Sequence, residues 1–147
     1  MTQPLAAPPA DNAGAVSEQT AVVLSADEIR LLTEIGFVAA GRGDVPRARQ
    51  VFEALAVLRP QRAFPRIGLA VALLNAGQAR EAVEVLERAP LQDAEERAML
   101  DAWRGFALQL AARRGESLRV LSRVAAGQGE AAALARSLLG RPGAGDE

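Results

Sequence analysis

Apolar residues recur every three or four positions through most of the chain after Ser25, which is the spacing that places them on one face of an α-helix. Glycine and proline interrupt this pattern at short intervals, and each interruption predicts the end of one helix and the start of the next. Strand periodicity is absent. The sequence therefore predicts an all-α fold with seven helices after Ser25, at about 26–40, 45–59, 65–75, 78–89, 94–113, 116–126 and a last one ending at Gly140.

Side chains that cap helix ends mark several of these boundaries. Ser25 followed by Glu28, and Asp93 followed by Glu96, match the capping box, which satisfies free backbone amides at the start of a helix. Gly115 is predicted to separate the fifth helix from the sixth.

The tripeptide Arg42-Gly43-Asp44 has two interpretations. In a secreted protein it could be a cell-adhesion ligand, whereas between two helices it is a turn followed by a helix cap. A glycine followed by small or apolar residues five and nine positions later recurs at Gly77 and Gly115. The tripeptide thus belongs to a repeated turn, and we favour the second interpretation, with Asp44 as the N-cap of the second helix.

Units of two helices that repeat every 34 residues resemble the tetratricopeptide repeat (TPR) family. The first unit matches the family pattern at Leu32, Ile35, Gly36, Ala39, Ala48, Phe52 and Pro60. The second unit matches it at Leu69, Ala70, Leu73, Ala82, Leu86 and Ala89, with Arg66 at the position of a large residue. The resemblance covers residues 29–126 and implies three TPR-like helical hairpins in a short right-handed solenoid.

The third unit can be aligned with the repeat in two ways. If Gly105 is the small residue at which two helices pack closely, Asp101 and Arg104 would be buried. If Ala107 is the small residue, these charges face outward, and the large packing positions are filled by Trp103, Phe106 and Leu110. We adopt the second alignment, which inserts about one residue before Gly115.

The pattern divides the chain into four parts. Residues 1–24 are rich in alanine, proline and small polar residues, and we expect a disordered or weakly helical tail. Residues 25–126 form the TPR-like domain, and 127–140 a capping helix with Ala131, Leu134, Ala135 and Leu138 on one face. Residues 141–147 are expected to be a second disordered tail.

The composition argues against most enzyme classes. The chain has no cysteine and no histidine, which removes thiolate catalysis and the commonest acid–base group at neutral pH. Most carboxylates have an arginine at helical spacing, as Glu53 has Arg49, and we expect solvated helix faces there. We therefore expect no enzyme, no catalytic residue, no metal site and no cofactor.

Other features bear on location and partners. Residues 1–29 carry no basic residue, and no apolar run reaches the roughly 18 residues of a transmembrane helix, so neither a secretory signal nor membrane insertion is expected. All 17 basic residues are arginines, scattered without a row of aromatic side chains, which argues against a nucleic-acid partner. The sequence thus predicts a cytoplasmic protein.

The TPR resemblance implies a peptide-binding groove on the concave side, which the first helix of each hairpin lines. At the groove positions the chain has the apolar residues Phe37, Phe64, Ile67, Val71, Leu74 and Leu108, with Arg30, Asp101 and Arg104 at the rim. Such an apolar groove is predicted to bind the apolar stripe of a partner helix. The alternative is that the N-terminal segment or the last helix folds back and covers the patch.

The stretch LLTEIGFVAAGRGDVPRARQVFEALAVLRP resembles the small TPR chaperones of bacterial type III secretion that hold needle or filament subunits. This resemblance implies a cytoplasmic chaperone that binds an amphipathic helix of a self-polymerising secreted subunit, and it allows for a small co-chaperone. A TPR chaperone of pore-forming translocator proteins and a generic TPR protein-interaction scaffold are the alternatives, and an enzyme is the alternative from another class.

Overall fold

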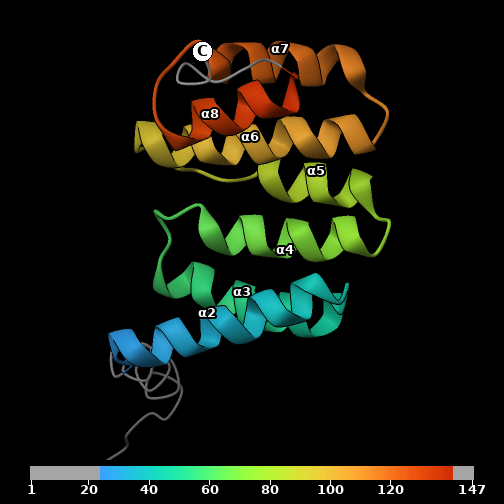
Figure 1. Ribbon diagram of the computed structural model, residues 1–147. Helices are drawn as coiled ribbons and strands as arrows, with labels where there is room; N and C mark the ends of the chain where they lie inside the picture. The colour runs from blue at the N-terminus through green and yellow to red at the C-terminus, as the bar shows by residue number, and fades with distance from the viewer. Residues whose placement is uncertain (1–23, 141–147) are drawn as a thin grey trace, which may run out of the picture.

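The computed structural model describes residues 24–140, which are all-helical (Figure 1). The predictions for residues 1–23 and 141–147 lie outside this part of the chain. The helices are α2 (Ala26–Gly41), α3 (Val45–Leu58), α4 (Phe64–Asn75), α5 (Ala79–Glu87), α6 (Ala94–Leu110), α7 (Arg114–Ala125) and α8 (Glu130–Leu138). The predicted all-α class is confirmed, and residues 24–140 contain no strand.

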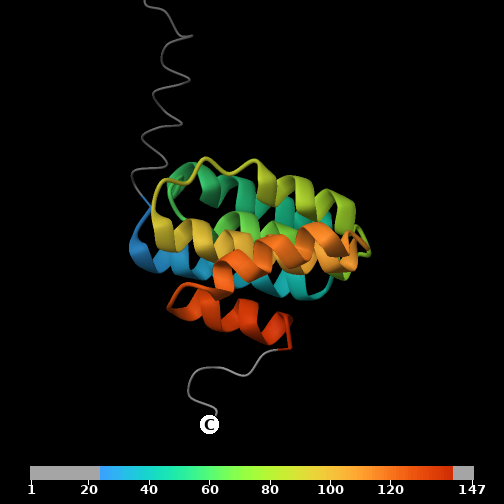
Figure 2. The ribbon, with the colours of Figure 1, turned by 90° about the horizontal axis from the view of Figure 1, so that it is seen from above.

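The helices form a short TPR-like solenoid. Consecutive helices pack side by side, so that α2 with α3, α4 with α5, and α6 with α7 make three stacked hairpins (Figure 1). The first helices of the hairpins also contact one another, α2 with α4 and α4 with α6. The helices α2, α4 and α6 thus form a row. Helix α8 extends this row, since it packs against both α6 and α7 (Figure 2).

The turn inside each hairpin has the same hydrogen-bonded geometry. One residue adopts a left-handed backbone, with φ of 67° at Gly43, 79° at Gly77 and 63° at Ala112. The amide of the following residue donates to a carbonyl five residues back, at N–O distances of 2.9, 2.8 and 2.9 Å. These are the bonds of a Schellman motif, which satisfies carbonyls at the end of a helix. The tripeptide beginning at Arg42 thus forms the first of these turns.

The prediction for Gly115 is wrong. This residue lies in the first turn of α7, and the left-handed position of the third turn belongs to Ala112. The helix caps, in contrast, are confirmed: the side chains of Ser25, Asp44 and Asp93 each accept a bond from the amide three residues on.

Two glycines allow the ring of Phe52 to lie between the first two hairpins. The Phe52 side chain of α3 is 1% exposed, and it faces Gly36 of α2 and Gly68 of α4. A Cβ atom at Gly36 would lie 2.8 Å from the ring, and one at Gly68 would overlap it. Glycine is required here because α4 approaches α3 more closely than any side chain permits.

A corresponding contact in the third hairpin shows that this unit follows the first of the two alignments, with Gly105 as the small packing residue. Gly105 of α6 faces Leu121 of α7, 16 residues on in the same hairpin, as Gly36 faces Phe52, and a Cβ atom at Gly105 would overlap the Leu121 side chain. The Ser117 hydroxyl, which is buried, donates to the Gly105 carbonyl at 2.7 Å. The packing glycine is therefore Gly105, and Leu110, expected in a packing position, is 54% exposed.

The two charged residues that argued against this alignment pair with each other. Asp101 and Arg104 are half-buried, and an Arg104 nitrogen lies 3.3 Å from an Asp101 oxygen. Since each charge compensates the other, the alignment does not leave an unpaired charge against the core.

Candidate functional site

An open pocket of about 610 Å³ lies between three helices of the row formed by α2, α4, α6 and α8. It lies where the N-terminal ends of α4, α6 and α8 come together on one side of the stack (Figure 1). The walls come from three segments that are far apart in sequence: Arg62, Ala63, Phe64 and Ile67; Ala94, Glu95, Glu96, Ala98 and Met99; and Gln128, Gly129, Glu130 and Ala131.

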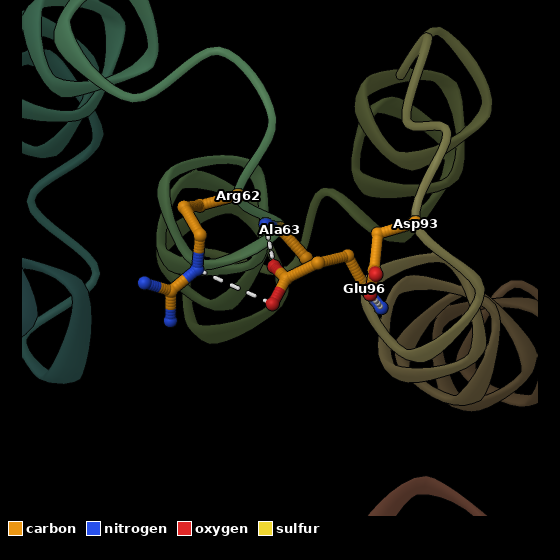
Figure 3. Close-up of polar contacts among 4 residues, drawn as sticks. All are labelled: Arg62, Ala63, Asp93 and Glu96. Carbon is orange, nitrogen blue, oxygen red and sulfur yellow. Dashed lines mark hydrogen bonds and ion pairs between the residues drawn. The ribbon is translucent and has the colours of Figure 1, made fainter.

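The wall between α4 and α6 is held by the Glu96 carboxylate (Figure 3). One oxygen accepts from the backbone amide of Ala63 at 2.6 Å, and the other lies 3.2 Å from Nε of Arg62. The backbone amide of Glu96 donates to the Asp93 side chain at 3.0 Å. One half of the predicted capping box is present, since Asp93 accepts from the Glu96 amide. The Glu96 side chain instead binds the start of α4 in the preceding hairpin. This bond fixes the ends of two helices that line the pocket.

Replacing Glu96 with alanine is expected to lower the free energy of unfolding by about 1–3 kcal/mol, because the amide of Ala63, a residue that is 2% exposed, loses its acceptor. Glu96→Gln keeps a side-chain oxygen and should lose less. Urea unfolding followed by circular dichroism measures both variants, with the exposed neighbour Glu95→Ala as the control. A loss with Glu95→Ala as large as that with Glu96→Ala would contradict the role of this bond.

The pocket combines apolar walls with an acidic rim. Phe64, Ile67, Met99 and Ala131 supply apolar side chains from all three helices. Arg62 is already engaged, since it pairs with Glu96 and its guanidinium carbon lies 5.6 Å from the centre of the Phe64 ring. Glu95 and Glu130 are exposed and make no ion pair with any of residues 24–140. The site therefore suits an apolar side chain flanked by positive charge.

The structure brings some of the predicted groove residues to this pocket. Phe64 and Ile67 line it, although Ile67 is only 7% exposed. Val71 and Leu74 lie further along α4, half-buried and packed against the core. Phe37 is 38% exposed on α2 and packs edge-on against the Phe52 ring at a centroid distance of 4.9 Å.

The other predicted rim and groove residues lie elsewhere. Arg30 is exposed on α2 and is not part of the pocket. Asp101 and Arg104 line a separate hollow of about 330 Å³ beside the end of α5. Leu108 is fully buried in the core and cannot extend an open groove. All three third-unit positions follow from the incorrect alignment.

The alignment on Gly105 places one further residue, Met99, in the pocket. Gly105 lies 35 residues after Ala70, and the same shift carries Phe64 onto Met99, which lines the pocket. It also carries Ile67 onto Ala102, which is buried in one hydrophobic cluster with Ala131 and Ala135 of α8. Helix α8 thus covers this part of α6, as in the alternative in which the last helix folds back over the apolar patch.

Residues 39–102 match the tetratricopeptide repeat family model. The matched segment runs from the end of α2 through α3, α4 and α5 into α6, and it lies inside the range of the sequence resemblance. The match supports a TPR protein, and TPR repeats are non-catalytic protein-interaction repeats. No curated protein and no solved structure matches the chain. None of the helices in residues 24–140 has the length and hydropathy to cross a membrane.

Proposed function

We propose that this chain is a protein-interaction scaffold whose pocket between α4, α6 and α8 binds an amphipathic helix of another protein. The observation that carries the proposal is the combination, in one open hollow of about 610 Å³, of apolar walls with two carboxylates that make no ion pair within residues 24–140. Apolar grooves bind the apolar stripe of a helix, and charge at the rim selects the partner and its orientation. The TPR match supports a protein partner.

The rim charge defines the chemistry of the partner. Glu95 and Glu130 stand on two different helices beside the apolar walls, and the one arginine of the rim is paired with Glu96. A partner helix with lysine or arginine next to its apolar stripe would place opposite charges together. Both glutamates also lie in the first turn of a helix, where a carboxylate interacts favourably with the helix dipole. The experiment must separate these two roles.

Two synthetic helical peptides with the same apolar stripe, one flanked by lysines and one by glutamates, provide the test. Fluorescence anisotropy at low salt should show at least tenfold tighter binding of the lysine peptide, because exposed charges interact more strongly when screening is weak. The double variant Glu95→Arg with Glu130→Arg should reverse the preference, and Glu84→Arg on the exposed side of α5 should not. If the double variant melts at a lower temperature but still prefers the lysine peptide, the two carboxylates stabilise their helices through the helix dipole and do not select the partner.

A narrower proposal makes the bound helix part of a needle or filament subunit of type III secretion and places the complex in the cytoplasm. It rests on the sequence resemblance, whereas the family match supports the interaction scaffold alone. Co-expression with such a subunit should keep the subunit out of sedimentable polymer, and the rim variant should release it. Polymerisation that continues despite peptide binding in the pocket would remove the secretion role and leave the scaffold.

A further inference from the structure

Helix α2 exposes a row of large apolar side chains that is separate from the pocket. Leu31, Ile35 and Val38 are 57%, 48% and 56% exposed, and their spacing places them on one face of the helix. They lie at the end of the stack formed by residues 24–140, where α2 is the first described helix (Figure 1).

The equivalent positions in the second hairpin indicate what packs against this face of α2. Thirty-four residues after Leu31, Ile35 and Val38 come Pro65, Leu69 and Ala72 of α4, which are all buried. Helix α4 packs against α2 and α3 of the preceding hairpin, and Leu69 and Ala72 belong to the common core. The exposed row on α2 is therefore the face with which a first helix packs against another helix.

The charges at the two ends of the row indicate which helix this is. Asp27 lies four residues before Leu31, and Arg42 lies four residues after Val38. Both are exposed, and neither makes an ion pair with the rest of residues 24–140. If two such rows pack antiparallel about a twofold axis near Ile35, Leu31 of each copy meets Val38 of the other, and Asp27 meets Arg42 at both ends.

We propose that this face binds a second copy of the chain through antiparallel packing of the two α2 helices. A twofold interface uses the same surface on both copies, which the acidic and basic ends of the row allow. Glu34 corresponds to Gly68, which faces the preceding hairpin, so the two Glu34 side chains approach each other near the axis. Because this repulsion opposes association and a single helix face is small, we expect a dissociation constant on the order of 10 μM.

Sedimentation equilibrium of the full chain from about 1 to 200 μM, a range around that dissociation constant, tests the proposal. We expect a monomer–dimer equilibrium that Ile35→Arg weakens at least tenfold and that Glu34→Gln strengthens. Val57→Arg is the matched control, since Val57 is 75% exposed on α3 and should not affect dimerisation. Asp27→Arg and Arg42→Asp should each weaken the dimer, and the double variant should restore it.

A chain that stays monomeric at all concentrations would overturn the proposal. If Ile35→Arg then also lowers the melting temperature while Val57→Arg does not, residues 1–23 of the same chain cover the face. A dimer that persists in Ile35→Arg, or one that the double charge exchange fails to restore, would place the interface elsewhere. None of these outcomes bears on the peptide preference of the pocket, so the two proposals can fail independently.

Discussion

Gly68→Ala is expected to lower the free energy of unfolding by about 2 kcal/mol, although alanine is the better helix former by about 1 kcal/mol. The cause is the position of the Phe52 ring, which occupies the space that the new methyl group needs. An aromatic ring cannot withdraw as the end of a flexible chain can, so α4 must move away from α3 or the ring must leave its position. Either change disturbs the contact between the first two hairpins.

Urea unfolding of paired variants separates this clash from the general effect of a glycine substitution. Gly41→Ala is the control, because Gly41 is the last residue of α2 and has no atom within 4 Å of a new Cβ. The second hairpin has Leu86 where the first has Phe52, so Phe52→Leu should remove part of the clash. A double variant with Phe52→Leu should therefore lose less stability than the two single losses added together. Strict additivity would show that the ring and the methyl group do not compete for space.

Local sequence signals predicted the helices because each of them acts within one turn. Ser25, Asp44 and Asp93 cap helices through bonds to residues three positions away, and the spacing alone reveals such bonds. The third turn was misplaced because Ala112 adopts a left-handed backbone that usually indicates glycine, while Gly115 stands three residues later inside a helix. The tertiary fold imposes the conformation of Ala112 against its local preference.

Two of the residues predicted for the groove, Phe64 and Ile67, line the pocket. Asp101, Arg104 and Leu108 lie elsewhere because of the alignment of the third unit, and the other four, Arg30, Phe37, Val71 and Leu74, lie outside the pocket although their units were aligned correctly. The rest of the site depends on contacts that no short spacing reveals. Glu96 bonds to an amide 33 residues before it, and Glu130 reaches the pocket only because α8 packs back on α6.

Leu108→Ala is expected to lower the free energy of unfolding by about 2–5 kcal/mol, as removal of a fully buried leucine side chain does. If Leu108 lined an open groove, as the second alignment predicts, the same substitution would cost almost nothing. Leu110→Ala is the matched control, because Leu110 lies two residues away on the same helix and is 54% exposed. We expect Leu110→Ala to change stability by less than about 0.5 kcal/mol.

The comparison of these two leucines decides between the alignments because they exchange roles. With Gly105 as the packing glycine, Leu108 points into the core and Leu110 points away from it; with Ala107, Leu110 packs and Leu108 lines the groove. Chemical denaturation of both variants measures the difference directly, provided that the free energy of unfolding depends on denaturant concentration with the same slope in both. A larger loss for Leu110→Ala would restore the second alignment and return Leu108, Asp101 and Arg104 to the groove. A larger loss for Leu108→Ala keeps Leu108 in the core and leaves the pocket beside Met99 as an open apolar site on α6, next to the part of the helix where Ala102 is buried in one cluster with residues of α8.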